Sequence, residues 1–169
     1  MYEILDQIEA ALENKLYYVA LFTTLMLPDI CGAIDSKNGE ATNRTYKKWY
    51  KTYAQNKCCN SLNATDCYNY RCSMIHQAKS THEKSSYDAI SFLVPSNHNI
   101  VMHNITMRTN NKNVLNIDVC IFCKGMIDAV KHWLDVSKGS EPFETNIKQV
   151  IHTHSNGMPH MIQGIPTSY

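Results

Sequence analysis

The chain has 169 residues, of which 44% are hydrophobic, and a formal net charge of +1. This length suits a single domain that buries a core without the help of disulfides or metal ions. The small net charge excludes a protein that is basic over its whole surface, so any surface that binds nucleic acid has to be local.

The first residues and the longest apolar run bear on where the protein is found. Residues 1–6 contain no basic segment and no cleavage motif, which predicts that there is no signal peptide. The apolar run from Leu16 to Leu27 is interrupted by two threonines, and it falls short of the roughly 20 residues that a membrane-spanning helix needs. We therefore expect a cytoplasmic protein that does not contact a membrane.

Seven cysteines, an odd number in a chain without an export signal, favour free thiols. Cys120 and Cys123 have zinc-like spacing, but they lie on an apolar helical stripe with Ile117 and Ile127. A buried free cysteine packs as a small hydrophobe, and no second cysteine pair stands at the spacing of a zinc ribbon. The sequence thus predicts neither a metal site nor a cofactor.

Two helices are expected at the start of the chain. Apolar residues recur at helical spacing over residues 2–13, and a more continuously apolar helix follows over residues 15–27. Pro28 then interrupts or restarts the helix, and residues 29–33 form the next turn or two. The second helix is expected to be the central element of the core.

The next expected helix, residues 41–55, has an aromatic side and a basic side. The basic residues are Arg44, Lys47, Lys48 and Lys51, and the aromatic residues are Tyr46, Trp49, Tyr50 and Tyr53. Two interpretations stay open. The basic side follows an RNA backbone while the rings stack on bases, or the rings pack into the core while the lysines face water.

A further helix is expected over residues 66–79, with Thr65 or Asp66 as its N-cap. The pattern then changes to two short apolar runs on either side of a turn-like segment that starts at Pro95, which predicts a small β-hairpin at about residues 88–104. The strands of this hairpin are expected at residues 89–94 and 99–103, and its turn at residues 95–98.

A last long helix is expected over residues 116–136, followed by a short helix near residues 145–151 and a flexible end. The elements together predict a mainly all-α fold, a bundle of four to five helices with a small β-hairpin insertion. Residues 1–136 are expected to form this domain, and residues 137–169 a flexible C-terminal extension.

The helix at 66–79 carries the stretch Arg71-Cys72-Ser73-Met74-Ile75-His76. An arginine is always charged and stabilises a phosphorane, and histidine is the side chain whose ordinary pKa lies nearest neutral pH. Together these groups are typical of RNA cleavage without a metal ion. A purely structural interpretation stands beside this one, in which His76 lies on the surface and Arg71 pairs with Asp29 or Asp66.

The region from Tyr68 to Gln77 resembles the motif of the HEPN superfamily (higher eukaryotes and prokaryotes nucleotide-binding). Its members carry an arginine, usually a polar residue, and then a histidine near the end of the third or fourth helix. The resemblance implies an all-helical, metal-independent endoribonuclease of a toxin–antitoxin or phage-defence system. It also implies a homodimer, RNA as the substrate, and an antitoxin or another protein as a partner.

The resemblance assigns roles to residues of this sequence. The site it implies consists of Arg71 and His76 as catalytic residues, with Asp29, Cys72 and Ser73 in support. Asp29 would orient the arginine from the second helical segment. Cys72 is a departure from the family pattern, because active members usually carry Asn, Asp or His after the arginine.

Helix geometry constrains how the two catalytic residues meet. Five residues of separation correspond to about 140° of rotation and roughly 7.5 Å of rise, so Arg71 and His76 do not point the same way from one straight helix. Either the helix is distorted near His76, or two subunits pair these helices across a two-fold axis.

The implied reaction is transesterification within RNA. His76 would act as general base on the ribose 2′-hydroxyl or as acid on the leaving oxygen, while Arg71 holds the phosphate. The product would carry a 2′,3′-cyclic phosphate, and DNA would be excluded. Two alternatives stay open: a catalytically silent HEPN-like module that binds nucleotide, RNA or a protein partner, and a structural helical protein in which Arg71 makes a buried ion pair.

Overall fold

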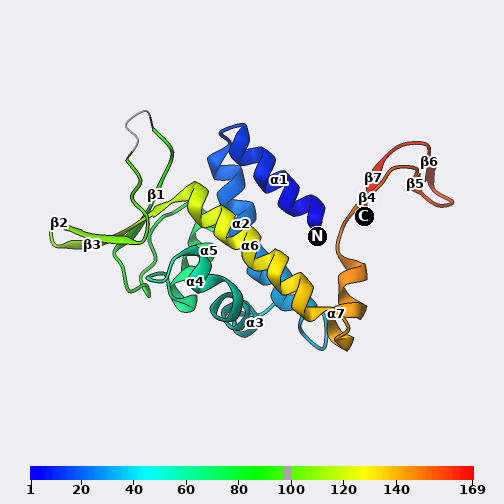
Figure 1. Cartoon of the computed structure of the whole chain (residues 1–169), viewed down its shortest axis with the longest axis horizontal. Helices are drawn as coiled ribbons and strands as arrows, with labels where there is room; N and C mark the ends of the chain where they lie inside the picture. Colours follow the sequence, from blue (N-terminus) through cyan, green and yellow to red (C-terminus); the bar gives the residue numbers. More distant parts are fainter. Residues whose placement is uncertain (97–99) are drawn as a thin grey trace.

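The computed structural model describes residues 1–96 and 100–169. Helices make up 53% of the chain, and strands make up 15% in three small sheets. The chain is therefore a mixed α/β protein, and the prediction of a mainly all-α bundle with a hairpin insertion is wrong. The helices form the body of the molecule, with the three-stranded sheet at one end and the C-terminal strands at the other (Figure 1).

One apolar helix forms the centre of this body. The helices are α1 (Tyr2–Glu13), α2 (Tyr17–Ile34), α3 (Asn43–Trp49), α4 (Gln55–Cys58), α5 (Ala64–Gln77) and α6 (Val119–Ser137). Helix α2 packs against α1, α3, α5 and α6. Its residues Leu21, Leu25 and Leu27 are buried, and each such side chain stabilises the fold by about 1.5–3 kcal/mol. The prediction that this segment is central to the core is confirmed.

Helix α2 continues through Pro28 to Ile34, so the expected interruption at the proline is wrong. A proline inside a helix removes one backbone hydrogen bond. The turns beyond it bury Cys31 and Ile34, and this burial offsets the lost bond. The continuous helix is what carries Asp29 to the side of α2 that meets α5.

The segment predicted as one helix over residues 41–55 consists of α3, a π-helical turn η1 (Tyr50–Ala54), and α4. Tyr46, Trp49 and Tyr50 are buried, while Lys48 and Lys51 are exposed. The interpretation in which the aromatic residues pack into the core is confirmed for these three rings. The outward basic side is left available to a polyanion.

The three-stranded sheet differs from the predicted hairpin. Its strands are β1 (Ala89–Leu93), β2 (Ile105–Thr109) and β3 (Lys112–Asp118), in the order β1-β3-β2. Strand β1 pairs with β3 in parallel, and residues 100–103 form no strand, so the hairpin expected at 88–104 is wrong. Residues 97–99 of the expected turn and second strand lie outside the described residues.

The hairpin that does form joins β2 to β3, which pair in antiparallel register. Asn110 and Asn111 connect them, both with positive φ (47° and 61°). Asparagine tolerates this left-handed region, and two such residues in a row match a tight hairpin turn. Strand β3 also includes residues 116–118, which the sequence predicts at the start of the last helix.

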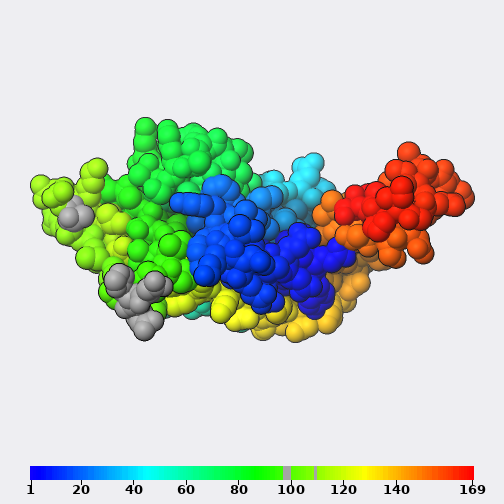
Figure 2. All heavy atoms as spheres, turned by 90° about the horizontal axis from the view of Figure 1, so that it is seen from above, coloured from blue at the N-terminus to red at the C-terminus, as the bar shows by residue number. Residues whose placement is uncertain are grey.

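The C-terminal extension begins with α7 (Glu141–Asn146) and a short 3-10 helix, η2 (Ile147–Gln149). The Asn146 side-chain amide donates to the carbonyls of Ile34 (3.0 Å) and Ser36 (2.8 Å), which ties α7 to the end of α2. Two small ladders follow, one formed by β4 (Thr153–His154) and β7 (Thr167–Ser168), the other by β5 (Gly157–Met158) and β6 (Ile162–Gln163). Figure 2 shows this segment, in orange and red, projecting from the helical body.

One helix is long and apolar enough to cross a membrane by length and composition alone. It is α2, and half of it is buried inside the fold. Core helices of soluble proteins meet the same criterion, so this finding is weak evidence for a membrane span.

Candidate catalytic and RNA-binding site

Helix α5, which carries the Arg-x4-His stretch, is regular over its whole length. Its N-cap is Asn63 rather than Thr65 or Asp66, because the Asn63 side-chain oxygen accepts hydrogen bonds from both of their backbone N–H groups. The helix ends at Ala78, which adopts a left-handed conformation (φ 51°). No distortion near His76 turns it toward Arg71 within one chain.

Arg71 is held by Asp29 across the contact between α5 and α2. The Arg71 Nη2 atom lies 2.5 Å from Asp29 Oδ2, with side-chain exposures of 22% and 14%. Burial raises the pKa of Asp29, and the guanidinium opposes this rise. Burial lowers the pKa of Arg71, but Asp29 and Cys72 together outweigh burial, so that the pKa of Arg71 is raised. The structure thus brings together two of the predicted site residues, in the ion pair that the structural interpretation also predicts, and the Arg71 Nε atom is buried.

Cys72 and Lys47 lie close to this ion pair. The Arg71 Nη1 atom donates to Cys72 Sγ at 3.9 Å, a weak contact. Tyr68, one turn earlier on α5, carries the Lys47 ammonium 5.4 Å from its ring centroid and packs edge-on against Tyr46. Burial raises the pKa of Tyr68, so its hydroxyl stays protonated at neutral pH. One residue of the basic stripe on α3 therefore reaches the motif helix.

His76 lies in the last turn of α5 with its side chain exposed. At about 100° per residue, Arg71 and His76 stand at the two edges of the outward face of α5. The partly exposed residues Tyr68, Cys72 and Ile75 lie between them. A single chain therefore presents the two predicted catalytic groups on one open face, but it does not bring them into contact.

A partly exposed apolar stripe on α2 runs toward Asp29. Tyr18, Phe22 and Met26 follow one another at four-residue spacing; Tyr18 and Met26 are 75% and 42% exposed, and Phe22 is half-buried. The next position at this spacing is Ile30, which directly follows Asp29. An apolar stripe of this kind that ends at a charged pair is typical of a surface that contacts another protein.

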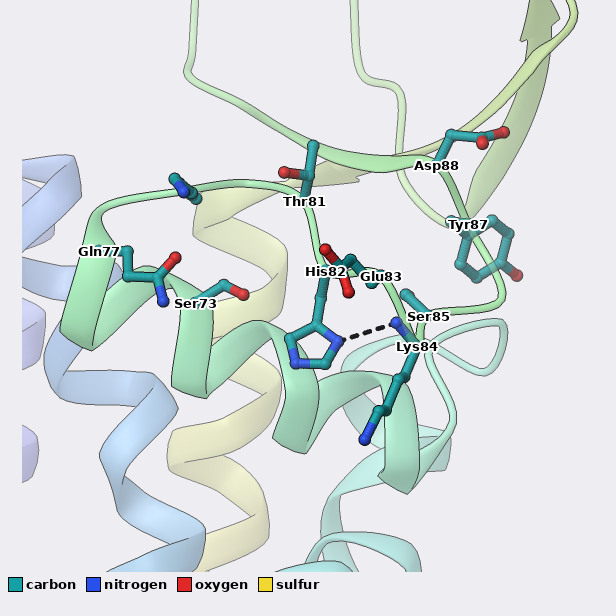
Figure 3. A pocket seen from close by; sticks show the side chains of 10 residues that line it. Ser73, Gln77, Thr81, His82, Glu83, Lys84, Ser85, Tyr87 and Asp88 are labelled. Carbon is teal, nitrogen blue, oxygen red and sulfur yellow. Dashed lines mark hydrogen bonds between the residues drawn. The ribbon is translucent and has the colours of Figure 1, made fainter.

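Ser73 points away from the ion pair. It is buried on the other side of α5, where it lines a polar cavity under the loop of residues 79–88. Ser73 and Gln77 face this loop from α5 (Figure 3). The structure therefore does not bring Ser73 together with Arg71 as a supporting residue of one site.

The remaining residues of the predicted RNA-binding stripe lie on α3 and η1. Arg44, Lys48 and Lys51 are exposed, and among the described contacts only Lys47 approaches a residue of α5. Helix α3 packs directly against α5, and Lys48 lines a small pocket with Asp35 at the end of α2. Lys47 is therefore the residue that brings the stripe next to the motif helix.

Sequence reasoning missed the loop of residues 79–88 and the residue that anchors it. Asp66 is 1% exposed and accepts hydrogen bonds from Ser85 Oγ (3.0 Å), Ser86 N (2.8 Å) and Asn63 Nδ2 (2.6 Å). The sequence signal for this anchor is that Asp66 falls on the buried side of an amphipathic helix. A buried carboxylate requires hydrogen-bond partners, which predicts that another segment packs on it.

Comparison of the chain with protein-family models, with curated proteins and with solved structures finds no match in any of the three. The function is therefore inferred from the geometry of the residues described above.

Proposed function

We propose that the chain is a HEPN-like, metal-independent endoribonuclease that acts as a homodimer in the cytoplasm. One observation carries the proposal: Asp29 on α2 holds the partly exposed Arg71 side chain at one edge of the outward face of α5, at whose other edge His76 is exposed. A positioned guanidinium and an imidazole that can transfer a proton are the minimum that phosphodiester transesterification requires.

In the proposed reaction, His76 takes the proton of the ribose 2′-hydroxyl, and the resulting oxygen attacks the adjacent phosphorus. The 5′-oxygen of the next nucleotide leaves and takes up a proton, so the products are a 2′,3′-cyclic phosphate and a 5′-hydroxyl. Arg71 stabilises the negative charge on the pentacoordinate phosphorus through charge-assisted hydrogen bonds. Asp29 is a positioning residue, because it touches Arg71 and is the less exposed of the two side chains.

The separation of Arg71 and His76 on one helix supports a site built from two chains. If two α5 helices cross about a two-fold axis, Arg71 of one chain faces His76 of the other, and two equivalent sites result. The exposed Tyr18 and Met26 on α2, with the partly buried Phe22 between them, supply apolar surface for such a contact.

The basic stripe supports the choice of RNA as substrate. Lys47 lies over Tyr68 next to the Arg71 face, and Arg44, Lys48 and Lys51 extend the positive charge along α3 and η1. Such a row of charges attracts a phosphate backbone and releases its counterions. A toxin or phage-defence role, with an antitoxin as partner, is the setting that the family resemblance suggests.

The test is cleavage of labelled single-stranded RNA by the purified protein in excess chelator. The wild type should cleave, while Arg71→Ala and His76→Ala should lose activity with their folds intact. Arg108→Ala and His132→Ala are matched controls, because both residues are exposed and far from α5 in sequence. Equal cleavage by all five proteins would mean contamination and would remove the support for the proposal.

A second candidate function is a silent HEPN-like module that binds RNA or a protein partner. The observation that favours it is the lack of contact between Arg71 and His76 within one chain, together with Cys72 after the arginine. Binding of RNA without cleavage over a broad panel of sequences would decide for this module.

A further inference from the structure

A polar cavity of about 620 Å³ lies between α5 and the loop that follows it. Its volume falls within the range of about 300–1,000 Å³ that is usual for small-molecule sites. The lining residues are Ser73 and Gln77 from α5, and Lys79, Thr81, His82, Glu83, Lys84, Ser85, Tyr87 and Asp88 from the loop. Figure 3 shows the loop arching over the α5 residues.

The loop is held in this arch by groups that do not line the cavity. The buried Asp66 carboxylate accepts hydrogen bonds from Ser85 and Ser86, and the Asn69 side chain donates to the Lys84 carbonyl at 3.1 Å. Hydrogen bonds to a charged group such as the Asp66 carboxylate are stronger than those between neutral groups. The cavity is therefore preformed, which lowers the entropic cost of binding a ligand.

Three lining side chains besides Ser85 are also oriented by partners. The Tyr87 hydroxyl donates to the Ser61 carbonyl (3.0 Å), Asp88 accepts from Asn113 N (2.7 Å), and His82 Nδ1 accepts from Lys84 N (3.1 Å). The last bond, dashed in Figure 3, leaves the ring proton of a neutral His82 on Nε2. His82 thus presents a fixed N–H donor.

Three further lining side chains have polar groups that are free to bind a ligand. The side chains of Ser73, Gln77 and Thr81 make no hydrogen bond to the described part of the chain. A carboxamide such as that of Gln77 has a donor and an acceptor side by side, which matches the paired donors and acceptors on the edge of a nucleobase. Ser73 lies one turn away on the same side of α5.

The charges of the lining limit what the cavity accepts. Two lysines (Lys79 and Lys84) and two carboxylates (Glu83 and Asp88) line it, so the formal charge is zero with histidine neutral. A neutral lining disfavours the several charges of a di- or triphosphate. It suits a ligand that combines a polar ring with one phosphate, whose oxygens pair with one of the lysines.

We propose that this cavity binds one nucleoside monophosphate unit of an RNA strand, with the base edge against Gln77 and Ser73 and the phosphate beside Lys84 or Lys79. Gln77 directly follows His76 in the last turn of α5. The cavity would therefore hold a nucleotide next to the scissile bond and set the base preference. This inference rests on the proposed function for the identity of the strand.

The experiment titrates the full chain with each of the four 5′-nucleoside monophosphates and follows backbone amide resonances by NMR. We expect saturable shifts at residues 79–88 for at least one nucleotide and a roughly tenfold weaker affinity in Gln77→Ala, which is the loss of about one good hydrogen bond. Gln7→Ala is the matched control, because Gln7 is exposed on α1. Ser73→Ala, titrated with the same nucleotides, is an independent second variant.

The outcomes separate this proposal from the proposed function. If no monophosphate shifts the loop resonances, or if Gln77→Ala and Ser73→Ala both bind as well as the wild type, the cavity assignment is wrong even where RNA is cleaved. If a monophosphate binds and Gln77→Ala weakens it, the assignment stands even where the wild type cleaves no RNA, and only the ribonuclease proposal fails. If RNA is cleaved, Gln77→Ala should also alter the base preference at the cleavage position.

Discussion

The carboxylate of Asp29 and the guanidinium of Arg71 form an ion pair between α2 and α5, with 14% and 22% of the two side chains exposed. The pair lies at the contact between α2 and α5. Asp29 is the less exposed partner, so a mostly buried carboxylate orients an arginine whose side chain is partly exposed.

Replacing Asp29 by Asn should reduce cleavage without unfolding the protein. Asparagine keeps the size of the side chain but removes the charge that orients Arg71. A misplaced catalytic group of this kind costs about 10- to 100-fold in rate. We expect the loss mainly in kcat, with a smaller change in KM, and partial rescue by Asp29→Glu.

The control for this change is the ion pair between Glu9 and Lys131, whose atoms lie 3.1 Å apart with both side chains nearly half exposed. Exposed pairs contribute little, so Glu9→Gln should leave both kcat and the thermal midpoint unchanged. An equal loss of activity in the Glu9 and Asp29 variants would contradict a specific positioning role.

Mixing two inactive variants should restore activity if the site is shared between subunits. In a mixed dimer of Arg71→Ala and His76→Ala chains, one of the two sites keeps both an arginine and a histidine. After random exchange of subunits the mixture should recover about a quarter of wild-type activity, because half of the dimers then carry one intact site. Unfolding and refolding the variants together promotes this exchange.

Either variant mixed with wild type provides the reference for subunit exchange. If the two inactive variants exchange subunits and the mixture stays inactive, the site does not combine residues of two chains. The monomer lacks a contact between Arg71 and His76, so that result would also remove the geometric basis for catalysis.

Neutralising the basic stripe should weaken RNA binding and reduce its salt dependence. Lys47→Ala removes one positive charge beside Tyr68 of α5, and Lys48→Ala removes one from the same basic stripe near Asp35. Each lost phosphate contact lowers the slope of log affinity against log salt by about 0.7 for a single strand. Fluorescence anisotropy with non-cleavable 2′-O-methyl RNA measures this slope. Lys138→Ala, at the far end of α6, should leave it unchanged.

The stability of the fold should fall in alkaline solution. Burial raises the pKa of Cys67 and of Cys123 from 9.0 to about 12. The unfolded chain therefore loses these protons before the folded chain does, so the stabilisation is complete below about pH 9 and is lost as the pH rises toward 12. Urea unfolding between pH 7 and pH 10.5 should show a decreasing free energy of unfolding.

The variant Cys123→Ala checks the cause of this decrease. Its free energy of unfolding should be lower at pH 7, because a buried group is lost, but it should decline less steeply with pH than that of the wild type. Cys72→Ala, a partly exposed site, serves as the comparison. An unchanged slope in the Cys123 variant would assign the decline to other groups, such as the buried tyrosines.

Local patterns predicted the helices well. The periodicity of residues 2–13 predicts α1, and the motif helix begins and ends two residues earlier than predicted, since Asn63 is the N-cap. The sequence offers Asp29 or Asp66 as the partner of Arg71, and the ion pair that forms is with Asp29. Amphipathic helices can be predicted from a few turns of sequence, because their pattern of buried residues repeats along the chain.

The sheet was mispredicted because its pairing is not local. Strand β1 pairs in parallel with β3, although β2 lies between them in the sequence. A pattern of neighbouring residues does not predict such a pairing. The Asn110–Asn111 turn was a readable signal for the β2–β3 hairpin. The cavity beside α5 was equally beyond sequence reasoning, because it depends on how Asp66 anchors a loop many residues later.

The most direct test of the central claim is the chemistry of the cleaved ends. Wild-type protein is incubated in excess chelator with a single-stranded RNA and with the same sequence carrying 2′-O-methyl groups, and the products are analysed by mass spectrometry. The account predicts fragments that end in a 2′,3′-cyclic phosphate and begin with a 5′-hydroxyl, no cleavage of the methylated strand, and loss of both products in His76→Ala. Products with a 3′-hydroxyl and a 5′-phosphate, or cleavage of the methylated strand, would contradict it.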